Sequence, residues 1–194
     1  MTRAAWPIVL LALVGCPSAP ERPRYIEPAS ALLGGAPPAA PASASGTVRL
    51  RSVDAAAALE RRVLWRLSDV ELGYSGEEQW TEAPATYVGQ ALGRELFEVR
   101  GVTRGSGPDA AVLDVVVRRF EEDRREGGHR ARVVLTLVLC GADGRGLLER
   151  TVDVERPVQG DQVEAMAAAM GAALDAAARA GADAVLAALA APAR

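Results

Sequence analysis

The sequence predicts an α+β domain of two layers, with a mainly antiparallel sheet of five to six strands and two helices packed on one face. Three runs rich in β-branched and apolar residues, 110–121, 130–140 and 146–155, are separated by gaps of hairpin length. The C-terminal stretch 161–190 is Ala-rich and repeats apolar side chains at helical spacing. The first observation predicts an antiparallel meander, and the second predicts a long helix that covers it.

The first strands are predicted between the N-terminal region and this meander. Residues 47–53 alternate apolar side chains with arginines, which is the period of a half-buried strand. Residues 62–67 and 70–75 alternate in the same way around a two-residue turn, which indicates an antiparallel hairpin. A helix over 54–64 is the competing interpretation, because a run of alanines favours it.

Two amphipathic stretches predict the helices. The first begins at Pro84 and keeps an apolar face at i, i+3, i+4 and i+8 as far as about Phe97. In the C-terminal helix, we expect Asp161 to be the N-cap residue, with Glu164 as the acid at N3.

The remaining stretches are expected to be a buried strand, a loop and a solvated edge. Residues 133–140 are apolar on both faces, so this strand should be central and the most buried. Residues 75–83 are polar and are expected to form a loop with Trp80 as its anchor. The acids 121–123 lie in an Arg-rich stretch, 118–132, that is expected to be a solvated edge of mixed sign.

The first residues have the layout of a secretory signal. An apolar run, 4–14, follows Arg3 and is too short to span a bilayer, which takes about 20 apolar residues. The run ends in Leu13-Val14-Gly15-Cys16, which resembles the lipobox of bacterial lipoproteins. Cys16 is therefore the predicted lipid-attachment site, carrying acyl chains such as palmitate. An ordinary signal peptide with a chance cysteine is the alternative.

These features divide the chain into three parts. Residues 1–15 are the predicted signal peptide, 16–46 the lipid anchor with a tether, and 47–191 a single domain. The tether is predicted because Pro, Ala and Ser dominate it, and such a composition buries too little apolar surface to fold. Residues 25–28 are expected to be an exception that docks on the body as a short extended piece.

The composition argues against several classes of site. Twenty-two basic residues, all arginine, face 25 acids, so no basic excess is available for a nucleic acid. The single histidine, His129, lies in an expected hairpin loop without a second ligand nearby. Cys140 lies inside an apolar strand and has no disulfide partner once Cys16 is acylated. The sequence therefore predicts no catalytic residue, no metal and no cofactor.

Three aromatic residues, Trp65, Tyr74 and Trp80, gather in one short stretch of a chain with only 4% aromatics. Two interpretations are open: a small satellite core, or an anchor surface for a protein partner.

The order of elements and several local phrases resemble the ABC-type transport auxiliary lipoprotein family, the PqiC type. The phrases begin with the lipobox and end with the long terminal helix. Between them lie Tyr25 to Pro28, Arg66-Leu67-Ser68-Asp69, Tyr74, Trp80-Thr81-Glu82, Glu95-Leu96-Phe97 and Phe120-Glu121. The long Ala- and Pro-rich tether departs from the pattern of this family.

The resemblance implies a non-catalytic adaptor at the periplasmic face of the outer membrane. Such a protein docks on an MCE-type lipid-transport protein with its ABC permease and ATPase; whether it is a homo-oligomer is left open. The residues after Cys16 lack the Asp of lipoproteins retained at the inner membrane, which favours the outer membrane. Two other classes stay open: an activator of a peptidoglycan synthase, and an assembly factor for lipopolysaccharide.

Overall fold

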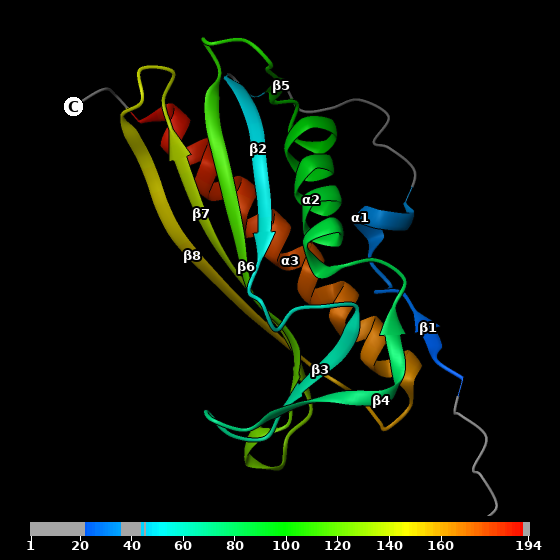
Figure 1. Ribbon diagram of the computed structural model, residues 1–194. Coiled ribbons are helices and arrows are strands. Elements are labelled where there is room, and N and C mark those ends of the chain that lie inside the picture. Colours follow the sequence, from blue (N-terminus) through cyan, green and yellow to red (C-terminus); the bar gives the residue numbers. More distant parts are fainter. Residues whose placement is uncertain (1–21, 36–43, 45, 192–194) are drawn as a thin grey trace, which may run out of the picture.

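The computed structural model describes residues 22–35, 44 and 46–191 (Figure 1). One mixed sheet of eight strands carries two main helices, α2 (Pro84–Arg94) and α3 (Val163–Ala190), on one face. This arrangement confirms the predicted two-layer α+β class, although the sheet has more strands than predicted.

The meander predicted from the three β-branched runs is present. Strands β6 (Ala111–Asp123), β7 (Arg130–Cys140) and β8 (Gly146–Pro157) pair antiparallel in chain order. A short 3-10 helix, η2 (Arg125–Gly127), lies in the turn between β6 and β7. As expected, β7 is central in the meander, and its residues that face the helices are fully buried.

Strand β6 also organises the other half of the sheet. Along its second edge, β2 (Thr47–Ala55) pairs with its first half and β3 (Arg62–Arg66) with its last residues, both in parallel. A two-residue strand, β5 (Thr103–Arg104), extends the sheet beyond β2. The competing prediction of a helix over 54–64 is wrong, because this stretch ends one strand and begins the next.

The predicted hairpin forms from β3 and β4 (Leu72–Trp80), but β4 is longer than expected. The expected loop over 75–83 is wrong as far as Trp80. The polar residues of this stretch lie on β4, which pairs with β3 on one side and with the edge strand β1 (Arg24–Ile26) on the other. The docking predicted for 25–28 thus takes the form of this parallel strand.

The strand directions in the sheet are mixed. Within the described residues, four of the seven strand pairings are parallel, and the antiparallel pairings that we expected are the longest, between β6 and β7 and between β7 and β8. The connections explain the parallel pairings. Strands β2 and β3 both pair with the same edge of β6, and α2 lies in the long connection between the hairpin and β6. Pairing between distant strands leaves no periodicity in the sequence.

Both helices end or begin differently from the prediction. A π-helical turn, Glu95–Val99, continues α2 past Arg94. The N-cap residue of α3 is Gln162, one residue after the expected Asp161, and no side chain caps the helix. Within the described part of the chain, no helix is long and apolar enough to cross a membrane.

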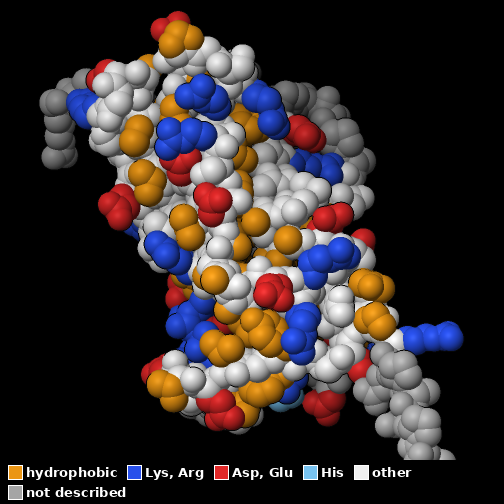
Figure 2. Space-filling model, in the orientation of Figure 1, with side chains coloured by type: hydrophobic (Ala, Val, Ile, Leu, Met, Phe, Trp, Pro, Cys, Tyr) orange, Lys and Arg blue, Asp and Glu red, His pale blue; other side chains and the backbone are white. Residues whose placement is uncertain are grey.

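The core lies between the sheet and the helices and depends on small residues of α3. Gly181 approaches β7 so closely that an added Cβ would lie 3.1 Å from Leu137. Alanines on the same face of α3 are almost fully buried, and so the helix can pack near the sheet. The opposite face of the sheet has basic and acidic side chains interspersed over it, as Figure 2 shows.

The N-terminal residues 24–34 belong to the folded body, although we expected a tether as far as residue 46. A four-residue helix, α1 (Ala31–Gly34), is capped by the buried carboxylate of Asp175 on α3. This carboxylate accepts hydrogen bonds from Ser30 Oγ (2.5 Å) and from the backbone N–H groups of Ala31 (2.9 Å) and Leu32 (3.3 Å). Residues 36–43 and 45 of the predicted tether lie outside the described residues.

Truncation of Trp80 tests its place in the core. Trp80 is fully buried, with Phe120 and Tyr87 against it in edge-to-face geometry. We expect Trp80→Ala to lower the free energy of unfolding by about 3–5 kcal/mol, because the indole leaves a cavity. Denaturant unfolding measures the loss. The control, Val70→Ala at an exposed position, should change it by less than about 0.5 kcal/mol.

Candidate functional site

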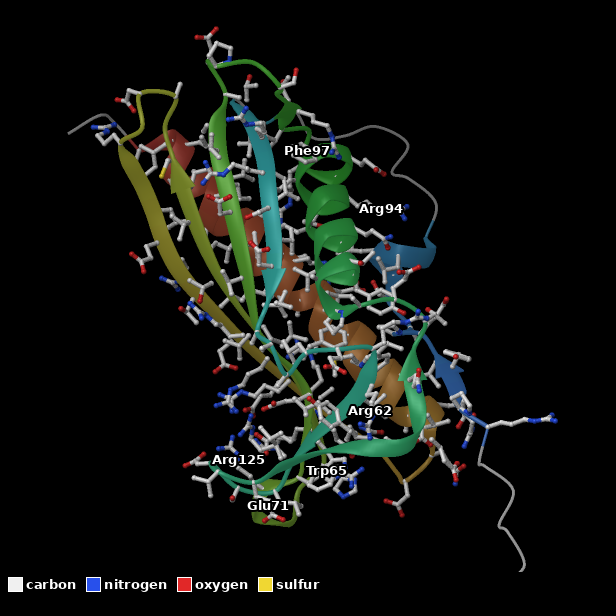
Figure 3. All side chains as sticks on the ribbon, in the orientation of Figure 1. Arg62, Trp65, Glu71, Arg94, Phe97 and Arg125 are labelled. Atoms are coloured by element: carbon white, nitrogen blue, oxygen red, sulfur yellow. The ribbon has the colours of Figure 1, made fainter. Side chains whose placement is uncertain are left out.

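The candidate site is the end of the molecule where the β3–β4 hairpin meets the β6–β7 turn, which we call the hairpin end (Figure 3). It consists of the turn 67–71, strand β3, the last residues of β6 and the turn 124–129. Figure 3 shows Trp65, Glu71 and Arg125 together at this end, away from Arg94 and Phe97 on the α2 side. These parts of the chain meet because β3 pairs with the last residues of β6.

Three consecutive acids at the end of β6 are buried. Glu121, Glu122 and Asp123 have exposed fractions of 1%, 6% and 5%. The prediction that they lie on a solvated edge is wrong, because β6 continues through Asp123 and is flanked there by β3 and β7. A buried carboxylate is costly unless it is paired, so the partners of these acids decide the structure of this end.

Arginines from β3, from β6 itself and from the β6–β7 turn neutralise Glu121 and Asp123. Arg66 of β3 donates two hydrogen bonds to Glu121, at 2.7 Å and 3.1 Å, and Arg119 contacts the same carboxylate at 2.9 Å. Arg125 donates to both oxygens of Asp123, from Nε to Oδ1 at 2.9 Å and from Nη2 to Oδ2 at 2.5 Å. These bidentate contacts join the hairpin to β6 and hold the β6–β7 turn.

The charged partners shift the pKa values of this cluster in the direction that favours the charged forms. The hydrogen bonds from Arg125 lower the pKa of Asp123 to about 2, from an ordinary value of 3.8. The hydrogen bonds to Glu121 raise the pKa of Arg66. The cluster is therefore a set of satisfied ion pairs, which makes it a structural element rather than a store of free acids or bases.

A pocket of about 320 Å³ opens beside the cluster, on the face of the sheet that carries the helices. Its apolar wall includes Val63, Trp65 and Met166, the last from α3. Its polar wall includes Glu122 and His129, whose Nδ1 lies 3.3 Å from Glu122 Oε1. His129 lies in the turn after η2 with an exposed side chain, as predicted, and its contact with Glu122 was not evident from the sequence.

The three aromatic residues singled out in the sequence do not form one surface. Trp80 is buried in the core, so the partner-anchor interpretation no longer applies to it. Trp65 is half-buried and lines the pocket, with the Arg124 guanidinium 5.8 Å from its ring. Tyr74 lies on β4, where the Arg62 guanidinium covers its ring at 4.5 Å. Partner binding stays a proposal for Trp65 and Tyr74.

Of the two cysteines, only Cys140 lies within the described residues. Cys16, the predicted lipid-attachment site, lies outside the described residues. Cys140 is a free, partly buried thiol at the end of β7. Within the described ranges, no group of three or more His, Cys, Asp or Glu side chains is placed to hold a metal ion.

Comparison with known families identifies the family of this chain. The family described as the ABC-type transport auxiliary lipoprotein component matches residues 32–182. The chain belongs to this family. The matched region includes the meander, the hairpin end and most of α3 in this auxiliary lipoprotein, and it confirms the resemblance seen in the sequence. No curated protein sequence matches the chain.

Solved structures share the fold of this auxiliary lipoprotein. Protein XCC0632 from Xanthomonas campestris has a TM-score of 0.66 at 23% identity, with 84% of this chain and 92% of that chain covered. The hypothetical protein CT253 from Chlamydia trachomatis has a TM-score of 0.56 at 8% identity, with 77% of this chain and 100% of that chain covered. At these identities the likeness concerns the fold alone.

Removal of Arg66 tests whether the cluster holds the hairpin end. We expect Arg66→Met to lower the free energy of unfolding by about 3 kcal/mol, because Glu121 would stay buried with one partner fewer. The matched control is Arg130→Met, whose ion pair with Glu155 is largely exposed and should contribute less than about 1 kcal/mol. Equal, small losses in chemical denaturation would contradict a structural role for the cluster.

Acid titration tests the paired state of Asp123. Because the native pKa is about 2 and the ordinary value is 3.8, the pair stabilises the fold fully above about pH 4 and loses its contribution as the pH falls towards 2. We expect the difference in melting temperature between the unsubstituted protein and Asp123→Asn to shrink over this interval. A difference that stays constant from pH 6 to pH 2 would show that Asp123 is not paired as described.

Proposed function

We propose that this auxiliary lipoprotein is a non-catalytic docking subunit of an MCE-type lipid-transport system, anchored through Cys16 to the periplasmic face of the outer membrane. Its partners are the MCE-type protein and the associated ABC permease and ATPase. The body supplies a binding surface to the complex, and the anchor determines where that surface is presented.

One observation carries the proposal: the family match spans most of the folded body. The buried acids of the candidate site are neutralised by arginines, which supports a non-catalytic role. A general acid or base needs a carboxyl group whose pKa lies near the working pH. The pKa of Asp123 is instead about 2, far below a neutral working pH, and its neighbours form ion pairs. These acids therefore hold the two hairpins in one geometry.

The anchor is proposed from residues 1–16 of the sequence, where Cys16 follows an apolar run. One short acyl chain binds a membrane only marginally, and a stable anchor takes two or more. A triacylated Cys16 would therefore keep the protein on the membrane permanently.

Membrane fractionation with affinity purification tests both parts of the proposal. We expect the unsubstituted protein to incorporate labelled palmitate, to sediment with outer membranes, and to co-purify with the MCE-type protein and its ABC subunits. Cys16→Ser should abolish labelling and sedimentation, because the acylated sulfur is lost. The control Cys140→Ser should change neither.

Three results would contradict the proposal. Recovery of a peptidoglycan synthase without any transport subunit would favour the first alternative class. Recovery of lipopolysaccharide-assembly proteins alone would favour the second. Membrane sedimentation of Cys16→Ser at the unsubstituted level would remove Cys16 as the anchor.

A further inference from the structure

The turn of the β3–β4 hairpin exposes apolar side chains at its tip. Within the described residues, four large apolar side chains are exposed, and Leu67, Val70 and Leu72 are three of them. Val70, at the apex, has 93% of its surface exposed. Exposed apolar groups gathered at one projecting point are typical of a surface that becomes buried against another molecule.

The tip is held in one conformation by its own hydrogen bonds. Ser68 Oγ accepts hydrogen bonds from the backbone N–H groups of Val70 (3.3 Å) and Glu71 (3.0 Å). The turn is closed by the Leu67 N–H, which donates to the carbonyl of Glu71 at 3.1 Å. The loop therefore does not need to be ordered when it binds, which removes part of the entropic cost of association.

Ion pairs also fasten the tip to the rest of the hairpin end. Asp69 Oδ1 lies 2.8 Å from Arg125 Nη1, and the same guanidinium pairs with the buried Asp123. One residue before the tip, Arg66 pairs with the buried Glu121. One ion pair just before the turn and one within it thus connect the turn to the end of β6 and to η2, so the apolar side chains project from a rigid base.

The charge of the tip indicates whether it binds a lipid surface or a protein. Residues 67–72 contain two acids, Asp69 and Glu71, and no basic residue. Arg125 balances Asp69, whereas no described residue forms an ion pair with the exposed Glu71. The excess negative charge opposes insertion among anionic lipid headgroups and favours a basic rim on a protein.

We infer that the hairpin tip, Leu67 to Leu72, is a docking element that inserts Val70 and its apolar neighbours into an apolar depression rimmed by basic side chains on a protein subunit of the transport system. This inference rests on the proposed function and identifies the surface that makes the contact. Val70 and the two leucines supply the buried area, and Glu71 faces the basic rim.

Quantitative co-purification from membranes tests the docking element in the full-length, acylated protein. We expect Val70→Asp to lower the recovery of the MCE-type and ABC subunits at least tenfold, because a charge would enter the apolar depression. Glu71→Arg should lower it less and should weaken its dependence on salt. The control, Ser106→Asp in the exposed turn between β5 and β6, should keep full recovery.

Melting temperatures of the variants check that they are folded. We expect them to equal that of the unsubstituted protein, because Val70 and Glu71 are exposed. Full recovery with Val70→Asp would overturn the docking element while the proposed function stands. Failure of the unsubstituted protein to recover any transport subunit would overturn the proposed function and the docking element with it.

A separate experiment tests whether the tip binds a membrane instead of a protein. The non-acylated Cys16→Ser protein is mixed with vesicles of phosphatidylethanolamine and phosphatidylglycerol, with and without Val70→Asp. We expect no binding in either case. Binding that Val70→Asp abolishes, together with unchanged recovery of the subunits, would overturn the protein-docking role in favour of the lipid surface.

Discussion

Burial of Glu121, Glu122 and Asp123 is the constraint on which the hairpin end depends. Strand β6 continues between β3 and β7 to its last residue, and these carboxylates are almost fully buried. Each is therefore matched by an arginine, and the arginines come from three parts of the chain: β3, β6 with its turn, and β7. The need to neutralise charge joins one hairpin to the other, and the joined hairpins carry the exposed tip.

The buried carboxylate of Asp175 has a similar effect on the N-terminal segment. Asp175 of α3 caps the short helix α1, and Ala29 packs where a side chain on Gly171 would clash. The N-terminal segment is thereby attached to the long helix, and β1 adds to the edge of β4.

Much of the fold and part of the candidate site followed from local patterns. The β-branched runs of the meander and the amphipathic pattern of α2 were predicted correctly, because each element buries one face with its own period. The solvated edge predicted around Glu121 and the loop predicted around Trp80 were wrong for the opposite reason. Both residues lie in polar stretches, and their burial comes from β3 and β1, which pair with these stretches from distant parts of the sequence.

The sequence by itself determined the class of the fold and the family, and it predicts the lipobox, because these depend on residue types at fixed local spacing. Only the tertiary structure decided that the acids of β6 are structural, that Trp80 belongs to the core, and that Leu67, Val70 and Leu72 share one exposed tip. Those properties depend on which strands become neighbours. Strand pairing over long separations is set by the packing of the whole sheet, so no single stretch of the chain encodes it.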